Sequence, residues 1–219
     1  MIRQDFFMRM IEQLVKVLAK ILSNKEAGNY NAALNNIDDA FNTIVGLDHN
    51  IIAQLSANDI IALLEMSKDD TGVNIKCIVI AKLLREKEDL SKQGSNNKST
   101  LDYNYQKAIT LYLHGILNSK NVEINLHNYH LDVKDIVKNI INDIPDETRF
   151  RLFKFYEKIG EFDNAEDELF KLKKINYPKI EEEGILFFRN LEKLSDIELF
   201  NGNFSKEEIG QGLADFTIT

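Results

Sequence analysis

The residues best suited to chemistry are two histidines three positions apart, His127 and His130, and three carboxylates lie close by: Glu123, Asp132 and Asp135. Side chains three apart on a helix share a face, and imidazole nitrogens bind zinc or iron. However, apolar and polar residues alternate over residues 122–127, which predicts an extended linker followed by a helix from Asp132. Because the sequence offers no second ligand pair, we expect solvated loop histidines and no metal site.

Three further patterns that could support catalysis are weaker. Cys77, the single cysteine, lies in an apolar run, which predicts a buried structural thiol rather than a nucleophile. The segment Gly210-Gln-Gly212 lacks the following Lys-Ser/Thr of a phosphate loop. Adjacent carboxylates such as Asp38-Asp39 do not face one another on a helix. We therefore expect no catalytic residue, no cofactor and no enzymatic activity.

Composition limits the class of protein further. The chain has 219 residues, of which 44% are hydrophobic and 28% charged, and this balance is typical of a globular protein. We expect one domain over residues 1–219. A net charge of −8 argues against nucleic-acid binding, which needs a clustered basic surface. A single cysteine excludes an intrachain disulfide, and no apolar run reaches membrane-spanning length. These features predict a cytoplasmic protein without a nucleic-acid or membrane partner.

The elements that would have to position any functional group are helices joined by a repeated turn. Gly28-Asn-Tyr30-Asn-Ala-Ala33 and Gly160-Glu-Phe162-Asp-Asn-Ala165 both follow a long amphipathic run and precede apolar residues at helical spacing. The glycine ends one helix, we expect the aromatic to fill the notch between the two helices, and the alanine allows close approach. A weaker third copy follows Gly94, at Leu101, Tyr105 and Ala108.

This pattern predicts an all-α fold, a right-handed stack of helix pairs with turns at Gly28, Gly94 and Gly160. The three glycines lie 66 residues apart, which is close to twice the ~34-residue tetratricopeptide unit. Capping-box spacing at Ser56-Ala-Asn-Asp59 and Ser205-Lys-Glu-Glu208 marks the start of two helices. From apolar spacing we expect helices over residues 3–27, 33–46, 56–66, 75–92, 101–113, 146–159, 162–175 and 179–194, with another from Asp132 and a short one after Ser205.

The helix pairs resemble tetratricopeptide repeats (TPR) in degenerate form. In the last pair Tyr156, Gly160, Phe162, Ala165 and Leu169 occupy the aromatic, turn and packing positions of that motif. The chain as a whole is similar to an uncharacterised bacterial family of short TPR-like proteins, through its first fourteen residues, the Gly-x-Tyr joint and the turn at Gly46-Leu-Asp48. The resemblance implies a helical-repeat fold and no particular activity.

Repeat folds bind partners far more often than they transform substrates, so we interpret the chain as a protein–protein interaction or scaffold module. A small-molecule- or peptide-binding regulator on the same helices is the alternative. The motif spacing turns Leu14, Val17 and Ile21 inward and leaves an apolar face on the first helix where a wetted groove wall is expected. That face and its counterpart in the last pair are the expected interaction residues: Phe6, Phe7, Met10, Val15, Leu18, Leu22, Phe150, Lys154, Glu157 and Lys158.

Such a broad apolar face is expected to be covered, either by a later part of the same chain or by a second copy. The acidic C-terminal helices would complement the basic residues Arg3, Arg9 and Lys16 of the first helix. Two-fold homodimers are common among soluble proteins, and we favour a homodimer. The sequence names no other partner.

Overall fold

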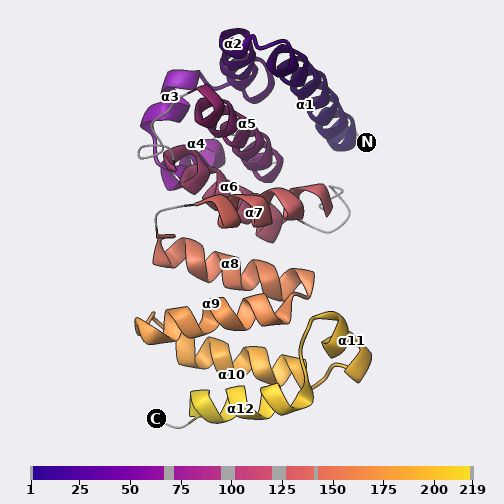
Figure 1. Ribbon diagram of the computed structural model, residues 1–219, viewed down its shortest axis with the longest axis vertical. Coiled ribbons are helices and arrows are strands. Elements are labelled where there is room, and N and C mark those ends of the chain that lie inside the picture. The colour runs from indigo at the N-terminus through magenta and orange to yellow at the C-terminus, as the bar shows by residue number, and fades with distance from the viewer. Residues whose placement is uncertain (1, 67–71, 95–101, 120–126, 141–142, 218–219) are drawn as a thin grey trace. The chain divides into compact units, whose positions relative to one another are not determined.

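The structure, a computed structural model, describes residues 2–66, 72–94, 102–119, 127–140 and 143–217 (Figure 1). The described residues form α-helices and one π-helical segment, and none of them forms a strand. The all-α prediction is therefore confirmed. By its contacts the chain divides into two compact units, Met1–Asp143 and Ile144–Thr219. The single domain over residues 1–219 stays a prediction.

The first unit contains seven α-helices among its described residues, with a π-helical segment after the second. They are α1 (Ile2–Glu26), α2 (Tyr30–Ala40), η1 (Phe41–Val45), α3 (His49–Gln54), α4 (Ala57–Met66), α5 (Val73–Gly94), α6 (Tyr103–Asn118) and α7 (His127–Asn139). The second unit contains α8 (Asp146–Ile159), α9 (Phe162–Lys174), α10 (Ile180–Leu191), α11 (Asp196–Asn201) and α12 (Lys206–Thr217).

The core of the first unit is the α5–α6 pair. Five successive α5 residues, Cys77 to Ala81, are fully buried, because apolar side chains surround this part of the helix on every side. Gly115 of α6 allows the two helices to approach closely, since a Cβ there would lie 2.6 Å from the carbonyl oxygen of Asn74. The prediction of a buried thiol at Cys77 is confirmed, and burial raises the pKa of this thiol to about 12.

Two of the three predicted turns have the expected backbone. Gly28 and Gly160 adopt φ angles of 73° and 78°, the left-handed conformation that glycine permits after a helix. Ala33 and Ala165, the alanines of the two joints, are fully buried. Gly94 is the last residue of α5, and the loop after it lies outside the described residues.

The expectation that Tyr30 fills the notch between α1 and α2 is wrong. Its side chain is 38% exposed. The predicted linker and the start of the following helix also need correction, because α7 begins at His127 rather than at Asp132, while residues 122–126 lie outside the described part. The short helices α3 and α11 were not predicted.

Both predicted capping boxes are confirmed. The Ser56 hydroxyl accepts from the Asp59 amide at 3.1 Å, and the Asp59 carboxylate accepts from the Ser56 amide at 3.2 Å. Ser205 and Glu208 form the same reciprocal pair at the start of α12, at 3.3 and 2.7 Å.

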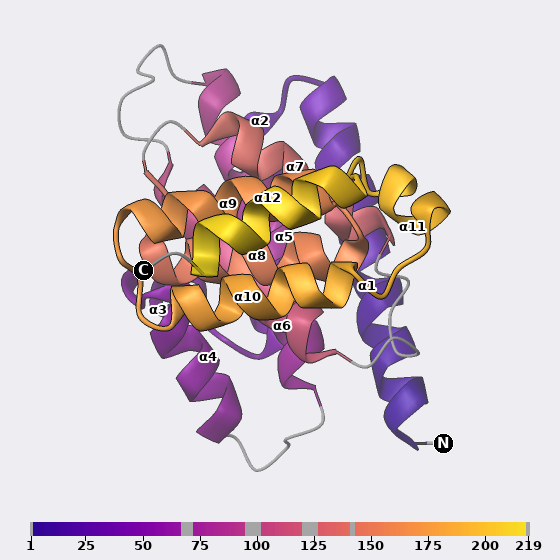
Figure 2. The same cartoon turned by 90° about the horizontal axis from the view of Figure 1, so that it is seen from below.

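In the second unit α8, α9, α10 and α12 stack in chain order (Figure 1), and the view along the stack shows successive helices alternating between two sides (Figure 2). The last pair interlocks through two glycines and two rings. A Cβ on Gly184 of α10 would lie 2.3 Å from the ring of Phe216, and a Cβ on Gly212 of α12 would lie 2.2 Å from the ring of Phe188. Each helix thus presents a ring to the glycine of the other.

Candidate interaction surface

Helix α1 divides its apolar residues between the core and an exposed face. Of the three residues that the spacing turned inward, Leu14 and Ile21 are buried, at 2% and 1% exposure, and Val17 is half-buried. The side chains of Met8, Val15 and Leu22 are 60%, 59% and 55% exposed. Three large apolar side chains in a row on one helix form a surface of the kind that binds a partner. We call Met8, Val15 and Leu22, with the half-buried Ile11 and Leu18 beside them, the α1 stripe.

The α1 stripe overlaps only partly with the residues predicted for this face. Val15 and Leu22 are exposed and Leu18 is half-buried. Met10 was expected on the exposed face, but it is 3% exposed, because it lies one helical turn before the buried Leu14. The side chains of Phe6 and Phe7 lie outside the described part of the structure.

Sequence reasoning missed Met8 and Ile11. The signal that could have found them is the seven-residue spacing of Met8, Val15 and Leu22, with Ile11 and Leu18 three residues after the first two. A search confined to the TPR motif does not test that spacing.

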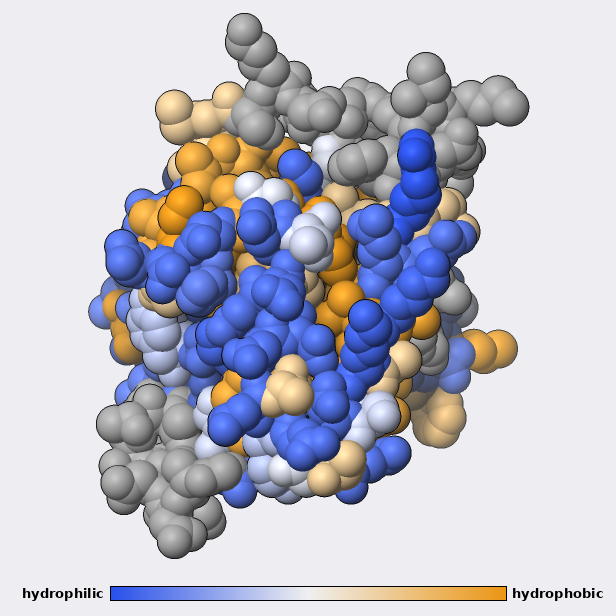
Figure 3. Space-filling view, turned by 90° about the horizontal axis from the view of Figure 1, so that it is seen from above, coloured by the Kyte–Doolittle hydropathy of each residue, from blue (hydrophilic) through white to orange (hydrophobic). Residues whose placement is uncertain are grey.

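Charged side chains share the solvent-exposed side of α1 with the stripe. Glu12, Lys16 and Lys20 are exposed, and no ion pair joins any of them to another residue in the part of the chain that the structure describes. Figure 3, which looks onto α1 and α2, shows orange apolar surface next to rows of blue hydrophilic side chains. On the helix Glu12 lies next to the stripe, whereas Lys16 and Lys20 lie further round, at about 100° and 140° from Val15.

The residues predicted on α8 are already engaged within their own unit. Phe150 stacks on Tyr177 with ring centroids 5.4 Å apart. The Lys154 ammonium group pairs with Glu157 at 3.1 Å and with Glu183 of α10 at 2.7 Å. These contacts connect α8 to its neighbours, and Lys158 alone among the four predicted residues is exposed. A role for this set in partner binding stays a prediction.

A network of charged and hydrogen-bonding groups connects α5, α6 and α7. The buried Asp132 of α7 accepts from the Tyr112 hydroxyl at 2.9 Å, from Lys82 at 3.0 Å and from Arg85. Arg85 also donates to Asp135 at 2.5 Å. Burial and the neighbouring Asp132 raise the pKa of Tyr112, so that this phenol stays a neutral donor. Each carboxylate has a cationic partner, and the network therefore acts as a clamp between helices.

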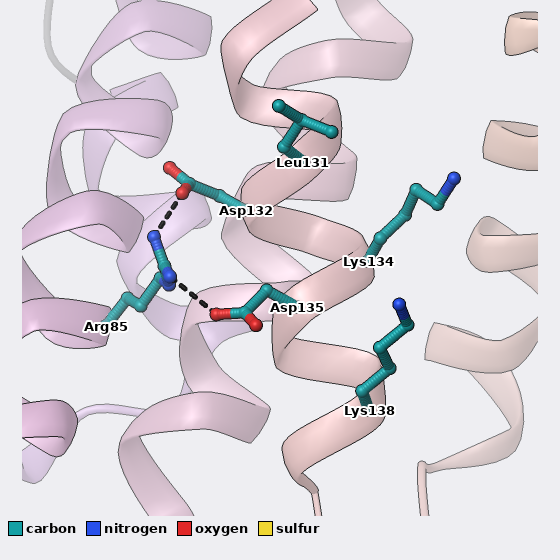
Figure 4. Close-up of a pocket in the computed structure, with 6 residues that line it drawn as sticks. All are labelled: Arg85, Leu131, Asp132, Lys134, Asp135 and Lys138. Atoms are coloured by element: carbon teal, nitrogen blue, oxygen red, sulfur yellow. Dashed lines mark hydrogen bonds and ion pairs between the residues drawn. The ribbon is translucent and has the colours of Figure 1, made fainter.

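A cavity of about 430 Å³ lies beside this clamp, lined by Arg85, Leu131, Asp132, Lys134, Asp135 and Lys138. Figure 4 shows Arg85 directed to the two aspartates, whereas Lys134 and Lys138 project from α7 on the side away from Arg85. Two cationic side chains at its edge would suit an anionic group.

The predicted metal candidates lie on α7. His127 and His130 are both helical, although the His127 side chain lies outside the described part. Among the described residues no group of three or more His, Cys, Asp or Glu side chains is placed to hold a metal ion. Within those residues there is also no helix with the length and apolar character needed to cross a membrane.

Comparison with known proteins gives a family but no activity. The model of a family of unknown function, DUF6483, matches residues 1–62 and 65–218. The chain belongs to this family. No curated protein and no solved structure matches the chain.

Proposed function

We propose that the chain is an intracellular TPR-like helical-repeat module that binds a protein or peptide partner and catalyses no reaction. The observation that supports this function is the α1 stripe. Fully burying a side chain the size of Met8, Val15 or Leu22 is worth ~1.5–3 kcal/mol, so covering the stripe offers a large gain in free energy.

The repeat character rests on the helix joints. The α1–α2 and α8–α9 turns have the same left-handed glycine and the same buried alanine five positions later, although the sequence between differs. The alternation of helices in the second unit is typical of stacked helix pairs. A binding role is favoured over catalysis because the strongest polar cluster consists of compensated ion pairs and the only thiol is buried.

Site-directed photo-crosslinking in the native cell tests the proposal. A photoreactive amino acid at Val15 is expected to capture a protein, whereas the same group at Gln13, which is exposed on another side of α1, is expected to capture none. Val15→Asp should abolish binding and Gln13→Asp should not. Equal capture at both positions, or none at Val15, would contradict the proposed surface.

A second candidate function, regulation by a small ligand, is favoured by the cavity beside the α5–α7 clamp. Its volume of about 430 Å³ falls within the range of ligand sites. The ligand would be a small anion, since Lys134 and Lys138 stand at the edge. Calorimetric titration with inorganic phosphate should give saturable heat that Lys138→Gln reduces. No heat with the unaltered protein would exclude this candidate.

A further inference from the structure

The short helix α11 holds two large apolar side chains away from the core. Phe200 is 80% exposed, and Ile197, three residues earlier on the same face, is 74% exposed. Leu199 of the same helix is buried in the core of the second unit. A complete capping box between Ser195 and Glu198 fixes the start of α11. We call Ile197 and Phe200 the α11 knob.

The backbone after α11 fixes the knob against the start of α9. The carbonyl oxygen of Gly202 accepts from the amides of Phe162 and Asp163 at 3.1 and 3.4 Å. The contact is tight, since a Cβ on Gly202 would lie 2.2 Å from the Phe162 ring and 2.7 Å from the carbonyl oxygen of Gly160. The Asn203 side chain donates to the Asp163 carboxylate at 2.9 Å. The knob ends three residues before Asn203, so it lies close to the first carboxylate of α9.

Helices α9 and α12 meet where the rings of Phe170 and Phe216 lie 5.4 Å apart between centroids. Near this contact lie five carboxylates, which we call the acidic flank: Asp163, Glu166 and Asp167 of α9, and Glu208 and Asp215 of α12. Burial and the four neighbouring carboxylates raise the pKa of Glu166 to about 7. Within the residues that the structure describes, no ion pair joins a member of the flank to a cation.

The cations at the edge of the flank are already engaged. The Lys173 ammonium group pairs with Glu181 at 3.0 Å and donates to the carbonyl oxygen of Asp215 at 2.7 Å. Lys206, the first residue of α12, pairs with Asp196 of α11 at 2.5 Å. This second ion pair connects the start of α11 to the start of α12. Since α11 is thus tied to both α9 and α12, the knob and the flank are neighbours on the second unit.

We propose that the knob and the acidic flank together bind a basic segment of another protein, whose Lys or Arg side chains reach the flank while its apolar side chains cover Ile197 and Phe200. An exposed aromatic side chain held on a fixed helix is suited to serve as an anchor in a partner's pocket. The uncompensated carboxylates select a cationic partner and orient it. This surface consists of residues other than the α1 stripe, and it can be tested separately.

The charge of the flank argues against other classes of partner. A nucleic acid or an anionic membrane surface carries phosphate groups, which the flank would repel. A neutral apolar partner that covered the knob and the flank would remove water from five carboxylates and provide no cation in exchange, at a large cost in free energy. A basic segment covers the knob and compensates the flank at the same time.

Fluorescence anisotropy with two labelled probes tests the chemistry of the partner. The first probe is an amphipathic leucine–lysine peptide of about 14 residues, or about four helical turns. The second probe is the same peptide with glutamate in place of every lysine. The protein should bind the lysine peptide saturably and the glutamate peptide at least ~10-fold more weakly. Equal affinity for the two probes, or no saturable binding of the lysine peptide, would overturn the inference.

Paired substitutions test the knob. Ile197→Ser with Phe200→Ser should raise the dissociation constant of the lysine peptide at least ~10-fold. The matched control is Ile175→Ser with Leu186→Ser, which removes two other exposed apolar side chains of the same unit and should leave the dissociation constant unchanged. Unchanged far-UV circular dichroism shows that each variant is folded. If both pairs weakened binding equally, the knob would have no special part and the inference would fail.

A second pair of variants tests the flank at constant net charge. Asp167→Asn with Asp215→Asn should raise the dissociation constant of the lysine peptide at least ~10-fold. Asp146→Asn with Glu182→Gln removes two exposed carboxylates elsewhere on the unit and should have a much smaller effect. Equal effects of the two pairs would mean that the peptide responds only to the net charge of the protein, and this would overturn the inference.

Val15→Asp with Leu22→Asp separates this surface from the α1 stripe. This variant should bind the lysine peptide as tightly as the unaltered protein does. Loss of binding would place the peptide on the α1 stripe and overturn the inference, while the proposed function would stand. Sedimentation equilibrium tests a further occupant: a dimer that dissociates in Ile197→Ser with Phe200→Ser would assign the knob to a second copy and would also overturn the inference.

Discussion

The interlocked glycines and rings of α10 and α12 allow a sharp test of packing in the second unit. The perturbation is Gly212→Ala, which adds one methyl group to a fully buried contact. The new Cβ would lie 2.2 Å from the ring of Phe188, whereas ordinary contact begins near 3.4 Å. Phe188 is completely buried and touches the rings of Phe187 and Phe216, at 5.0 and 5.8 Å between centroids. The ring therefore has little room to move aside.

The magnitude follows from two opposing effects. Overpacking a dense core lowers the free energy of unfolding by ~1–3 kcal/mol. Replacing glycine by alanine inside a helix stabilises the helix by ~1 kcal/mol. Gly210, two residues earlier in the same helix, provides the matched control, since a Cβ there meets no atom within 4 Å. We expect Gly210→Ala to stabilise the protein and Gly212→Ala to destabilise it, with a difference of ~1–3 kcal/mol between the two.

The assay is urea unfolding of the two variants, followed by far-UV circular dichroism and compared at the same protein concentration. Hydrogen exchange of amides in α10 and α12 should quicken in Gly212→Ala and not in Gly210→Ala. If the two variants had the same unfolding midpoint, the buried contact between Gly212 and Phe188 would not exist in solution, and the interlock would be refuted.

Three further predictions concern buried groups. Asp132→Asn should lower the free energy of unfolding in urea by ~1–3 kcal/mol, because Tyr112, Lys82 and Arg85 lose a shared acceptor. Asp135→Asn, which changes a half-exposed carboxylate, should lower it by less. Equal losses in the two variants would refute the clamp. Burial and neighbouring carboxylates raise the pKa of Glu166 from 4.5 to about 7, so the folded state keeps a proton that the unfolded state releases, and stability should fall as pH rises through this interval. Glu166→Gln should remove that loss near pH 8, and exposed Glu182→Gln should not. The Cys77 thiol, with a pKa near 12, should resist a disulfide reagent until denaturant is added, and rapid labelling of the native protein would contradict its burial.

Much of the fold could be predicted from the sequence because local signals determine where helices begin and end. The capping residues Ser56 and Ser205 form hydrogen bonds three residues along the chain, so their spacing is enough to predict them. Gly28 and Gly160 lie directly after amphipathic runs, and their conformation follows from that position. The start of α7 at His127 could not be predicted in this way, because the alternating residues before it resemble an extended segment.

The clamp and the interlock are less accessible to sequence reasoning, since both depend on residues far apart. Arg85 and Asp132 are separated by 47 positions, and Gly184 and Phe216 by 32. Their types are ordinary for exposed charges and for helix residues. Nothing local distinguishes Gly212, which meets a ring, from Gly210, which meets nothing. Only the packing of one helix on another gives the two glycines different roles.

Helix α1 shows how one segment can satisfy two requirements at the same time. The core of its unit needs apolar residues at the helical spacing of three and four, and Met10, Leu14 and Ile21 supply them. That need is met without Met8, Val15 or Leu22, which are each more than half exposed. Burial in the core therefore does not explain why these three residues are apolar, whereas the proposed partner surface would.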